Sequence, residues 1–342
     1  MSPTILISGT SGFVGSALGR AFRARGWQVT GVSRRPARAG AVDRQYPHDL
    51  AAPLPPDLPR ADVVVHAAAL ASPWARPADY TSNIVDATRH MLAFAQRTAA
   101  DHFVLISTTA VLYRAGDQFD LTEDDPYPAQ PINGYAAAKR AAEEMVRAAW
   151  PSASILRPRA VYGPGDTVLF PRIPDAARKG VLPRIVRSDG TAPLADVVYI
   201  DNLVHAVAVA IERRLAGVVH VTDGRPIDTG RMLDDVLIRL GYPLPKFRWS
   251  YDSAMRLAAV AEWGSRHLFG WREPPITRFG VSALTHCKTF SPQRMLDLIG
   301  PPQRPTLLIP LDAGETQQMI PQSVSPAGPS TGSLSKMTEK HI

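Results

Sequence analysis

A short apolar run followed by closely spaced glycines constrains the fold of this chain more than any other feature. Thr4–Ser8 has the composition of a buried strand, and the sequence GTSGFVG follows it at residues 9–15. A helix-like segment covers residues 12–25. A strand, a glycine turn and a helix in this order favour a phosphate-binding turn, because the unpaired N–H groups at a helix N-terminus attract an anion. The alternative is a glycine-rich turn without a ligand, which this context disfavours.

Each glycine has its own role in a turn of this kind. Gly9 can take the tight turn, Gly12 lets a pyrophosphate reach the backbone, and Gly15 lets the helix pack closely on the strand. The spacing therefore predicts a dinucleotide-binding turn.

Strands and helices alternate through the first half of the chain. The strand-like runs cover residues 4–8, 28–33, 62–67, 103–107 and 154–156, and the helix-like segments cover residues 12–25, 83–99 and 134–150. Strands rich in Val and Ile with helical crossovers predict a parallel sheet covered on both faces. The expected fold class is α/β, with a Rossmann doubly wound parallel sheet and a smaller, mostly helical C-terminal substrate lobe.

The second half of the chain is organised differently. Prolines interrupt the alternation after Pro158, and the later periodic segments look helical. We expect a dinucleotide-binding core with the reacting residues at 1–160, a substrate-binding lobe partly interleaved with the core at 161–312, and a tail at 313–342. The tail is rich in Ser, Pro, Thr, Gln and Gly, a composition typical of disorder.

Composition narrows the class of protein. Cys287 is the single cysteine, which excludes an intramolecular disulfide and a cysteine-based metal cluster, and no metal is expected. The net charge is +7, but the basic residues are scattered, so a solvated surface is favoured over a nucleic-acid interface. No apolar run reaches the roughly 18 residues of a membrane span. A soluble cytoplasmic protein is expected.

The end of the second strand indicates which dinucleotide is bound. An NAD site usually has an acidic residue there, about 20 residues after the glycines, whereas this chain has Ser33, Arg34 and Arg35. A hydroxyl and two guanidiniums can bind a 2′-phosphate, and arginine can do so bidentately. This favours NADP(H) over NAD(H). The alternative is that both arginines are solvated loop residues.

Two further segments lie where a cofactor could pass. Asp49 follows a short possible strand and could accept from an adenine amino group, although a turn or helix-cap role is equally consistent with its position. Small residues at 67–69 would allow backbone to approach the cofactor. His66, just before them, is more typical of a hydrogen-bonded structural histidine than of a catalyst.

Tyr135 and Lys139 form the pattern that points most directly to chemistry. Their spacing of four places both side chains on one face of a helix. A tyrosine with a pKa near ~10 exchanges protons poorly at neutral pH unless its phenolate is stabilised, which a nearby ammonium can do. The spacing alone is common in helices. However, a strand ends nearby in Ser107, Thr108 and Thr109, at the sheet edge where ligands bind in doubly wound folds.

These features together resemble the extended short-chain dehydrogenase/reductase superfamily. The resemblance rests on GTSGFVG at 9–15, on STT at 107–109 with Tyr113, on YAAAK at 135–139 and on LRPRAVYGPG at 156–165, and it covers about residues 4–310. Later segments, including DVVYIDN at 196–202, resemble the 3β-hydroxysteroid dehydrogenase-like branch, which also holds bacterial reductases of 2-alkyl-3-oxoalkanoates. Substrates of that branch are mostly apolar alcohols or ketones.

The resemblance implies roles for named residues. Thr109, aligned on Tyr113, would bond the reacting oxygen, Tyr135 would be the general acid/base, and Lys139 would support Tyr135 and the nicotinamide ribose. It also implies a homodimer formed through residues 83–99 and 134–150. The implied cofactor contacts are Gly9, Ser11, Gly12, Phe13, Val14, Gly15, Ser33, Arg34, Arg35, Asp49, Leu50, Ala67, Ala68, Tyr135, Lys139, Pro158 and Val161.

Two other functions remain open at this point. A nucleotide-sugar epimerase or dehydratase would need arginines for a second diphosphate, for which Arg225, Arg231 and Arg294 are candidates, but a dehydratase would typically carry an acid where this chain has Ala110. A non-catalytic NADPH-binding protein would not need the three reacting residues. The segment 251–269 could line an apolar substrate pocket or, as its periodicity slightly favours, pack in the core.

Overall fold

The computed structural model describes residues 2–166, 183–187, 189–239, 241–304 and 306. Its main sheet has seven parallel strands in the order β12-β7-β5-β4-β1-β2-β3. These strands are β1 (Thr4–Ser8), β2 (Gln28–Ser33), β3 (Arg44–Pro47), β4 (Val63–His66), β5 (His102–Ile106), β7 (Ser154–Pro158) and β12 (Gly217–Val221). The order reverses between β1 and β4, so the carboxyl ends of these two strands open the crevice in which doubly wound folds bind ligands.

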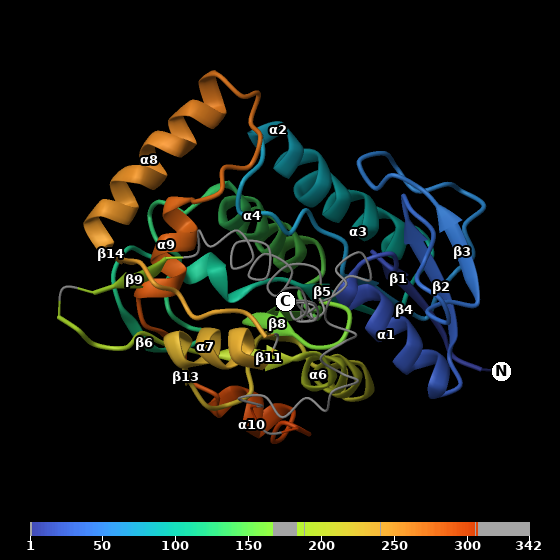
Figure 1. The fold of residues 1–342 in the computed structure, drawn as a ribbon. Coiled ribbons are helices and arrows are strands. Elements are labelled where there is room, and N and C mark those ends of the chain that lie inside the picture. The colour runs from blue at the N-terminus through green and yellow to red at the C-terminus, as the bar shows by residue number, and fades with distance from the viewer. Residues whose placement is uncertain (1, 167–182, 188, 240, 305, 307–342) are drawn as a thin grey trace, which may run out of the picture.

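Helices cover both faces of this sheet. Figure 1 shows α3 (Ala87–Arg97) and α4 (Gly134–Ala149) on one side and α1 (Phe13–Ala24) and α6 (Ile200–Glu212) on the other. A short α2 (Pro77–Tyr80) and a π-helical turn at Thr81–Asp86 lead into α3. The 3₁₀ turn at Thr109–Leu112 follows β5.

The central strands bury both of their faces. Ile5 and Ile7 of β1 pack with residues of α1 and α6, whereas Leu6 between them packs with residues of α3 and α4. Val64 of β4 and its two neighbours divide in the same way. Because successive strand residues point to opposite faces, a continuous apolar run is what a sheet sandwiched between helices requires.

The expected fold class is confirmed, and the strand predictions at β1 and β2 match the structure residue for residue. The sheet also contains β12, which the sequence analysis did not predict and which comes from the range expected to form the lobe. Helix α6 and the short α10 (Gln293–Leu298) come from the same range and also join the core on the sheet. β12 is five residues long, as β1 is, and only its pairing with β7 in the structure shows that it belongs to the sheet.

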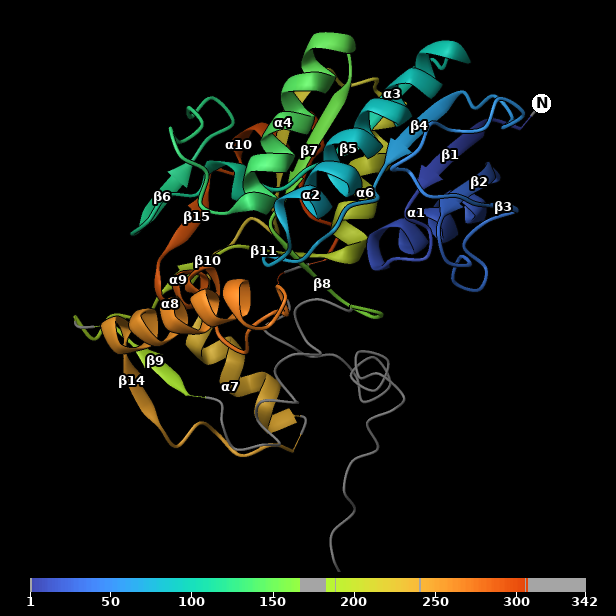
Figure 2. The ribbon, with the colours of Figure 1, turned by 90° about the horizontal axis from the view of Figure 1, so that it is seen from above.

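The remaining elements form a second group to one side of the sheet. Figure 2 shows α7 (Thr229–Arg239), α8 (Tyr251–His267) and α9 (Arg278–Thr285) gathered there with β9 (Arg184–Val186) and β14 (Arg248–Ser250). The other short strands are β6 (Gln118–Leu121), β8 (Ala160–Tyr162), β10 (Leu194–Ala195), β11 (Val197–Tyr199), β13 (Ile227–Asp228) and β15 (Lys288–Phe290). The tail predicted at 313–342 lies outside the described residues. Within the described part of the chain, none of the helices combines the length and apolar character that crossing a bilayer requires.

Candidate active site

The glycine turn joins β1 to α1 at the crevice between β1 and β4. Gly9 has φ +78°, and its N–H donates to Val32 O at 2.8 Å. A Cβ at Gly9 would lie 2.9 Å from Ala68 Cα, and a Cβ at Gly15 would lie 2.3 Å from Gly9 O. Gly12 caps α1, and a Cβ there would meet only Gly9 O, at 3.2 Å. Gly9 and Gly15 thus allow neighbouring backbone segments to pack closely. Gly12 instead leaves the N-terminus of α1 open, as a bound pyrophosphate requires.

Alanine at Gly15 and alanine at Gly12 should therefore have different effects. We expect Gly15→Ala to lower the free energy of unfolding by about 3 kcal/mol, because the new methyl group meets immobile backbone. Gly12→Ala should cost less than about 1 kcal/mol and mainly weaken dinucleotide binding. Urea unfolding and fluorescence titration with the dinucleotide measure the two effects, and equal destabilisation by both variants would contradict this assignment.

Arginines gather at the loop after β2. Ser33 is buried, and its hydroxyl donates to Arg35 O at 2.8 Å and accepts from Gln45 Nε2 at 3.0 Å. Arg34 and Arg35 are exposed, and Arg34 forms a 4.0 Å ion pair with Asp49. The loop also contains Arg38, which the sequence analysis overlooked although it lies three residues after Arg35.

Arg38 brings the cationic loop next to the glycine turn. Its N–H donates to Thr10 O at 3.4 Å, and its guanidinium donates to Gly165 O at 3.0 Å. Burial lowers the pKa of Arg38, and the neighbouring charges of Arg20 and Arg35 lower it further. Clustered like charges beside an open helix N-terminus favour an anion, so these residues fit the phosphates of a dinucleotide.

Several other predicted contacts have local structural roles. The Asp49 carboxylate accepts from Ala51 N at 3.0 Å, which is the turn role that the sequence left open, and the Leu50 side chain is buried in the core. The N–H groups of Ala67 and Ala68 donate to Ser8 Oγ at 3.1 Å and 3.0 Å.

His66 is held inside the protein, as expected for a structural histidine. Its Nδ1 lies 2.8 Å from Ser8 Oγ, and its Nε2 lies 3.1 Å from Thr88 Oγ1. Burial is the main cause that lowers the pKa of His66 to about 3, and the Lys139 charge adds to it. The ring is therefore neutral at physiological pH.

Tyr135 lies at the start of α4, close to the end of β5. The cap is Asn133, whose Oδ1 accepts from Ala136 N at 2.8 Å. Burial raises the pKa of Tyr135 to about 12, and a hydrogen bond with the Thr108 side chain opposes that rise. The phenol therefore stays protonated at neutral pH, and the interaction that favours its phenolate comes from Thr108 rather than from Lys139, from which it was expected.

Lys139 is buried one helical turn after Tyr135. Its ammonium donates to Ile106 O at 2.8 Å, the last residue of β5. Burial lowers the pKa of Lys139 to about 8, and the charge of Glu143 opposes this effect. Because Tyr135 and Lys139 both lie near the end of β5, the structure brings the predicted pair to the carboxyl edge of the sheet.

The hydroxyls after β5 point to different partners. Thr108 caps the 3₁₀ turn by accepting from Ala110 N at 3.2 Å, and it is the threonine that interacts with Tyr135. Thr109 is buried, and its Oγ1 lies 3.4 Å from Tyr113 Oη. The motif alignment selected Thr109 and gave no role to Thr108.

Pro158 and Val161 lie at the carboxyl end of β7 and just beyond it. Pro158 ends β7 and is buried, and Val161 lies in β8 and is half-buried. Both therefore lie near the edge of the sheet at which β5 ends.

A buried polar network lies behind Lys139. Glu143 and Arg157 are almost fully buried, and Arg157 Nη2 lies 2.7 Å from Glu143 Oε2. The same carboxylate accepts from Tyr127 Oη at 2.6 Å and from the Ser107 hydroxyl. This network fixes α4 against β5 and β7, and so it sets the position of Lys139.

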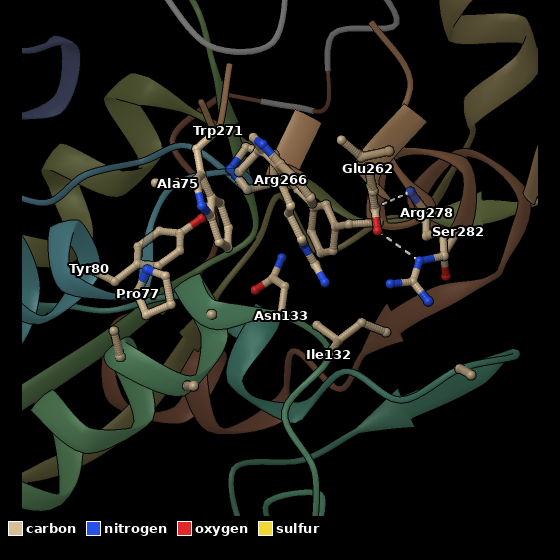
Figure 3. A pocket seen from close by; sticks show the side chains of 18 of the residues that line it. Ala75, Pro77, Tyr80, Ile132, Asn133, Glu262, Arg266, Trp271, Arg278 and Ser282 are labelled. Atoms are coloured by element: carbon tan, nitrogen blue, oxygen red, sulfur yellow. Dashed lines mark hydrogen bonds and ion pairs between the residues drawn. The ribbon is translucent and has the colours of Figure 1, made fainter. Parts of the chain in front are cut away.

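A cavity with a volume of about 650 Å³ opens beside the start of α4 (Figure 3). It is walled by the segment 132–134 and Ala115 on one side and by α8, α9 and the loop after β4 on the other. In segment 251–269, Met255 and Arg266 line the cavity, and Ala254 and Ala258 pack in an apolar cluster that Met255 also contacts. Leu257 and Leu268, in the same segment, are exposed.

Comparison with known proteins agrees with this geometry. Residues 5–221 match the model of the NAD dependent epimerase/dehydratase family. The chain is 33% identical over 310 residues to a 2-alkyl-3-oxoalkanoate reductase of Stenotrophomonas maltophilia, covering 85% of this chain and 92% of that protein. It is 28% identical over 259 residues to human sterol-4-alpha-carboxylate 3-dehydrogenase, decarboxylating, covering 72% of this chain and 69% of that protein.

The fold agrees with solved structures as well. The structure of MoeE5 in complex with UDP-glucose and NAD superposes with a TM-score of 0.69 at 21% identity, over 93% of this chain and 97% of that chain. At this identity the likeness shows the fold alone. The family model and the 33% identical reductase carry the assignment: the chain belongs to the NAD dependent epimerase/dehydratase family, on the branch of 2-alkyl-3-oxoalkanoate reductases and sterol-4-alpha-carboxylate dehydrogenases.

Proposed function

We propose that the protein is an NADP(H)-dependent oxidoreductase that transfers hydride between the nicotinamide and the carbonyl or alcohol of an apolar substrate. The observation that carries the proposal is that Tyr135 and Lys139 both lie at the carboxyl end of β5. The glycine turn follows β1 at the same edge of this parallel sheet. The names of the similar reductase and sterol dehydrogenase support redox chemistry on a carbonyl or an alcohol carbon.

The bound cofactor supplies hydride, and the residues of this chain handle the proton. Tyr135 donates its phenolic proton to the carbonyl oxygen as the carbonyl carbon is reduced. Thr108, which interacts with Tyr135, bonds that oxygen in place of the expected Thr109, which is buried beside Tyr113. A phenol with a pKa near 12 is protonated at neutral pH, which suits the reducing direction. Lys139 supports the phenolate that remains, because its ammonium is buried where water screens it little.

The arginine cluster favours NADP(H) over NAD(H). We expect the double variant Arg34→Ala, Arg35→Ala to raise the Kd for NADPH by about 10- to 100-fold, since charge-assisted hydrogen bonds to a 2′-phosphate are lost. The Kd for NADH should change by less than about 3-fold. Arg60→Ala is the control, because Arg60 pairs with Asp101 near the amino end of β4. A wild-type preference for NADH that the double variant leaves unaltered would exclude this cofactor assignment.

A direct assay tests the reaction itself. The purified protein is mixed with NADPH and a panel of apolar ketones and 3-oxo acids, and the absorbance of the reduced cofactor is followed. Stoichiometric oxidation of NADPH with formation of the alcohol is the expected result. Conversion of a nucleotide sugar with no net change in the cofactor would instead indicate an epimerase, and tight NADPH binding without turnover would indicate a binding protein.

The proposal also includes the oligomeric state of the protein and the part of the chain that binds the substrate. The helices at residues 83–99 and 134–150 would pair in a homodimer, and residues 161–312 would provide most of the substrate contacts. Light scattering of the purified protein measures the first, and a dimer is expected.

A further inference from the structure

The outer face of α8 exposes large apolar side chains. Val260, Trp263 and His267 are spaced three and four residues apart, so they form one stripe along the helix. Leu268 and Phe269 follow directly where the helix ends. The four apolar side chains of this set are 57% to 67% exposed, and we call them the α8 surface. Large apolar side chains gathered on one exposed face are typical of an interaction surface.

The opposite face of α8 fixes the helix to the rest of the protein. Ala254 and Ala258 are buried in one apolar cluster with Val281 of α9. Trp74 Nε1 donates to Ser265 Oγ at 2.9 Å, which ties the loop after β4 to α8. The helix also contacts β9 and β14, and it lies along the outer edge of the molecule (Figure 1). Because one face is held in this way, the α8 surface points away from the protein.

The chain around the α8 surface is basic. Residues 246–278 contain six Lys and Arg but only three Asp and Glu. One of these acids, Glu262, is buried and already accepts two hydrogen bonds from the first residue of α9. Arg256, Arg266 and Arg272 are exposed, and they lie on α8 or just beyond its end. A partner that covers the α8 surface would therefore meet positive charge around the apolar side chains.

We propose that the α8 surface binds the protein to a lipid bilayer that carries anionic headgroups. Tryptophan is favoured at the boundary between headgroups and acyl chains, and leucine and phenylalanine gain free energy by entering it. Arginines beside them attract anionic lipids, while their apolar stems stay along the helix. This inference is independent of the proposed function, because it concerns binding and not turnover.

A second copy of this chain would fit the α8 surface less well. In a symmetric dimer both copies contribute the same patch, so the arginines of one copy would face those of the other. Juxtaposed like charges oppose association. A bilayer with anionic lipids supplies the opposite charge, and its fluid interior takes up apolar side chains without having to match their shape. The charge around the α8 surface thus favours a lipid partner.

Co-sedimentation of the full chain with lipid vesicles tests the role of charge. We expect an affinity for vesicles of phosphatidylcholine mixed with phosphatidylglycerol that is at least about 10-fold above that for phosphatidylcholine alone. Added salt should weaken the binding to the mixed vesicles. The double variant Arg256→Gln, Arg272→Gln should lower that affinity by about 10-fold and leave binding to the neutral vesicles within about 3-fold.

Substitutions of the apolar side chains test direct contact with the lipid. Trp263→Ser and Phe269→Ser should each lower the affinity for the mixed vesicles by about 10-fold. Neither side chain lines the cavity, so the cavity keeps its wall. Phe119→Ser is the matched control, because Phe119 lies on β6 and is 58% exposed. Trp263→Phe should still bind, but brominated lipids should quench its fluorescence much less than that of the wild type.

Three results would overturn the proposal. The first is an absence of binding to both kinds of vesicle, and the second is equal binding to both. The third is a dimer, detected by light scattering, that Trp263→Ser and Phe269→Ser dissociate, because the α8 surface would then join two copies of this chain. Since the substituted side chains are exposed, the variants should keep the circular dichroism spectrum of the wild type.

Discussion

Replacing Tyr135 with phenylalanine should lower kcat by about 10²- to 10⁴-fold, the range by which a positioned general acid accelerates a reaction. The variant loses the hydroxyl that interacts with Thr108 and would donate the proton, while the ring keeps its packing against the core. Stopped-flow or steady-state oxidation of NADPH with a reducible ketone measures the change. Because only one oxygen is removed, the Kd for NADPH should stay within about 3-fold of the wild-type value.

The matched control is Tyr46→Phe. Tyr46 lies on β3, at one edge of the main sheet, and the variant likewise removes a single hydroxyl. We expect it to keep wild-type turnover. If Tyr135→Phe also turned over at the wild-type rate while folded and loaded with cofactor, Tyr135 would not be the proton donor, and the proposed mechanism would have to be abandoned.

Breaking the buried ion pair should produce the largest loss of stability. Arg157→Met would leave the buried Glu143 carboxylate with only the half-exposed Arg147, at 4.0 Å, within ion-pair distance, and we expect the free energy of unfolding to fall by about 3–5 kcal/mol. Urea denaturation followed by circular dichroism measures this loss. The loss of stability depends more on the burial of Glu143 than on how many groups contact it. No water can replace the guanidinium beside the desolvated carboxylate.

Two further variants show whether burial is the cause. Arg147 also pairs with Glu143, at 4.0 Å, but its side chain is 46% exposed, so Arg147→Met should cost less than about 1 kcal/mol. The double variant Arg157→Met, Glu143→Met removes both charges and should recover part of the stability lost in the single variant. A loss in Arg147→Met equal to that in Arg157→Met would show that the network does not act through an uncompensated buried charge.

Local patterns predicted the parts of the site that lie close together in the chain. The glycine turn between β1 and α1 could be recognised because each glycine answers a backbone requirement within a dozen residues. Tyr135 and Lys139 could be paired because the helical repeat brings residues four apart to one face. The burial of both faces of β1 and β4 was likewise visible as continuous apolar runs.

Features that depend on distant segments could not be found in this way. The role of Thr108 beside Tyr135 depends on how the turn after β5 meets α4, and motif alignment selected the neighbouring Thr109. The spacing of Lys139 and Tyr135 shows that the two side chains share a helix face. It does not show how strongly burial opposes ionisation of the Tyr135 phenol. The partners of Glu143 were also hidden, since Arg157 lies on a separate strand.

The sequence by itself determined the sheet-and-helix order of the first half, the glycine turn between β1 and α1, the arginines Arg34 and Arg35 after β2 and the tyrosine–lysine helix, because each of these follows from residue type and short-range repeat. The tertiary structure alone decided that β12 completes the sheet, that Arg38 lies against the glycine turn, and that Arg266 and Asn133 line one cavity. The physical reason is that burial and the pairing of charges are set by contacts between segments far apart in the chain, and these contacts leave no periodic signal in the sequence.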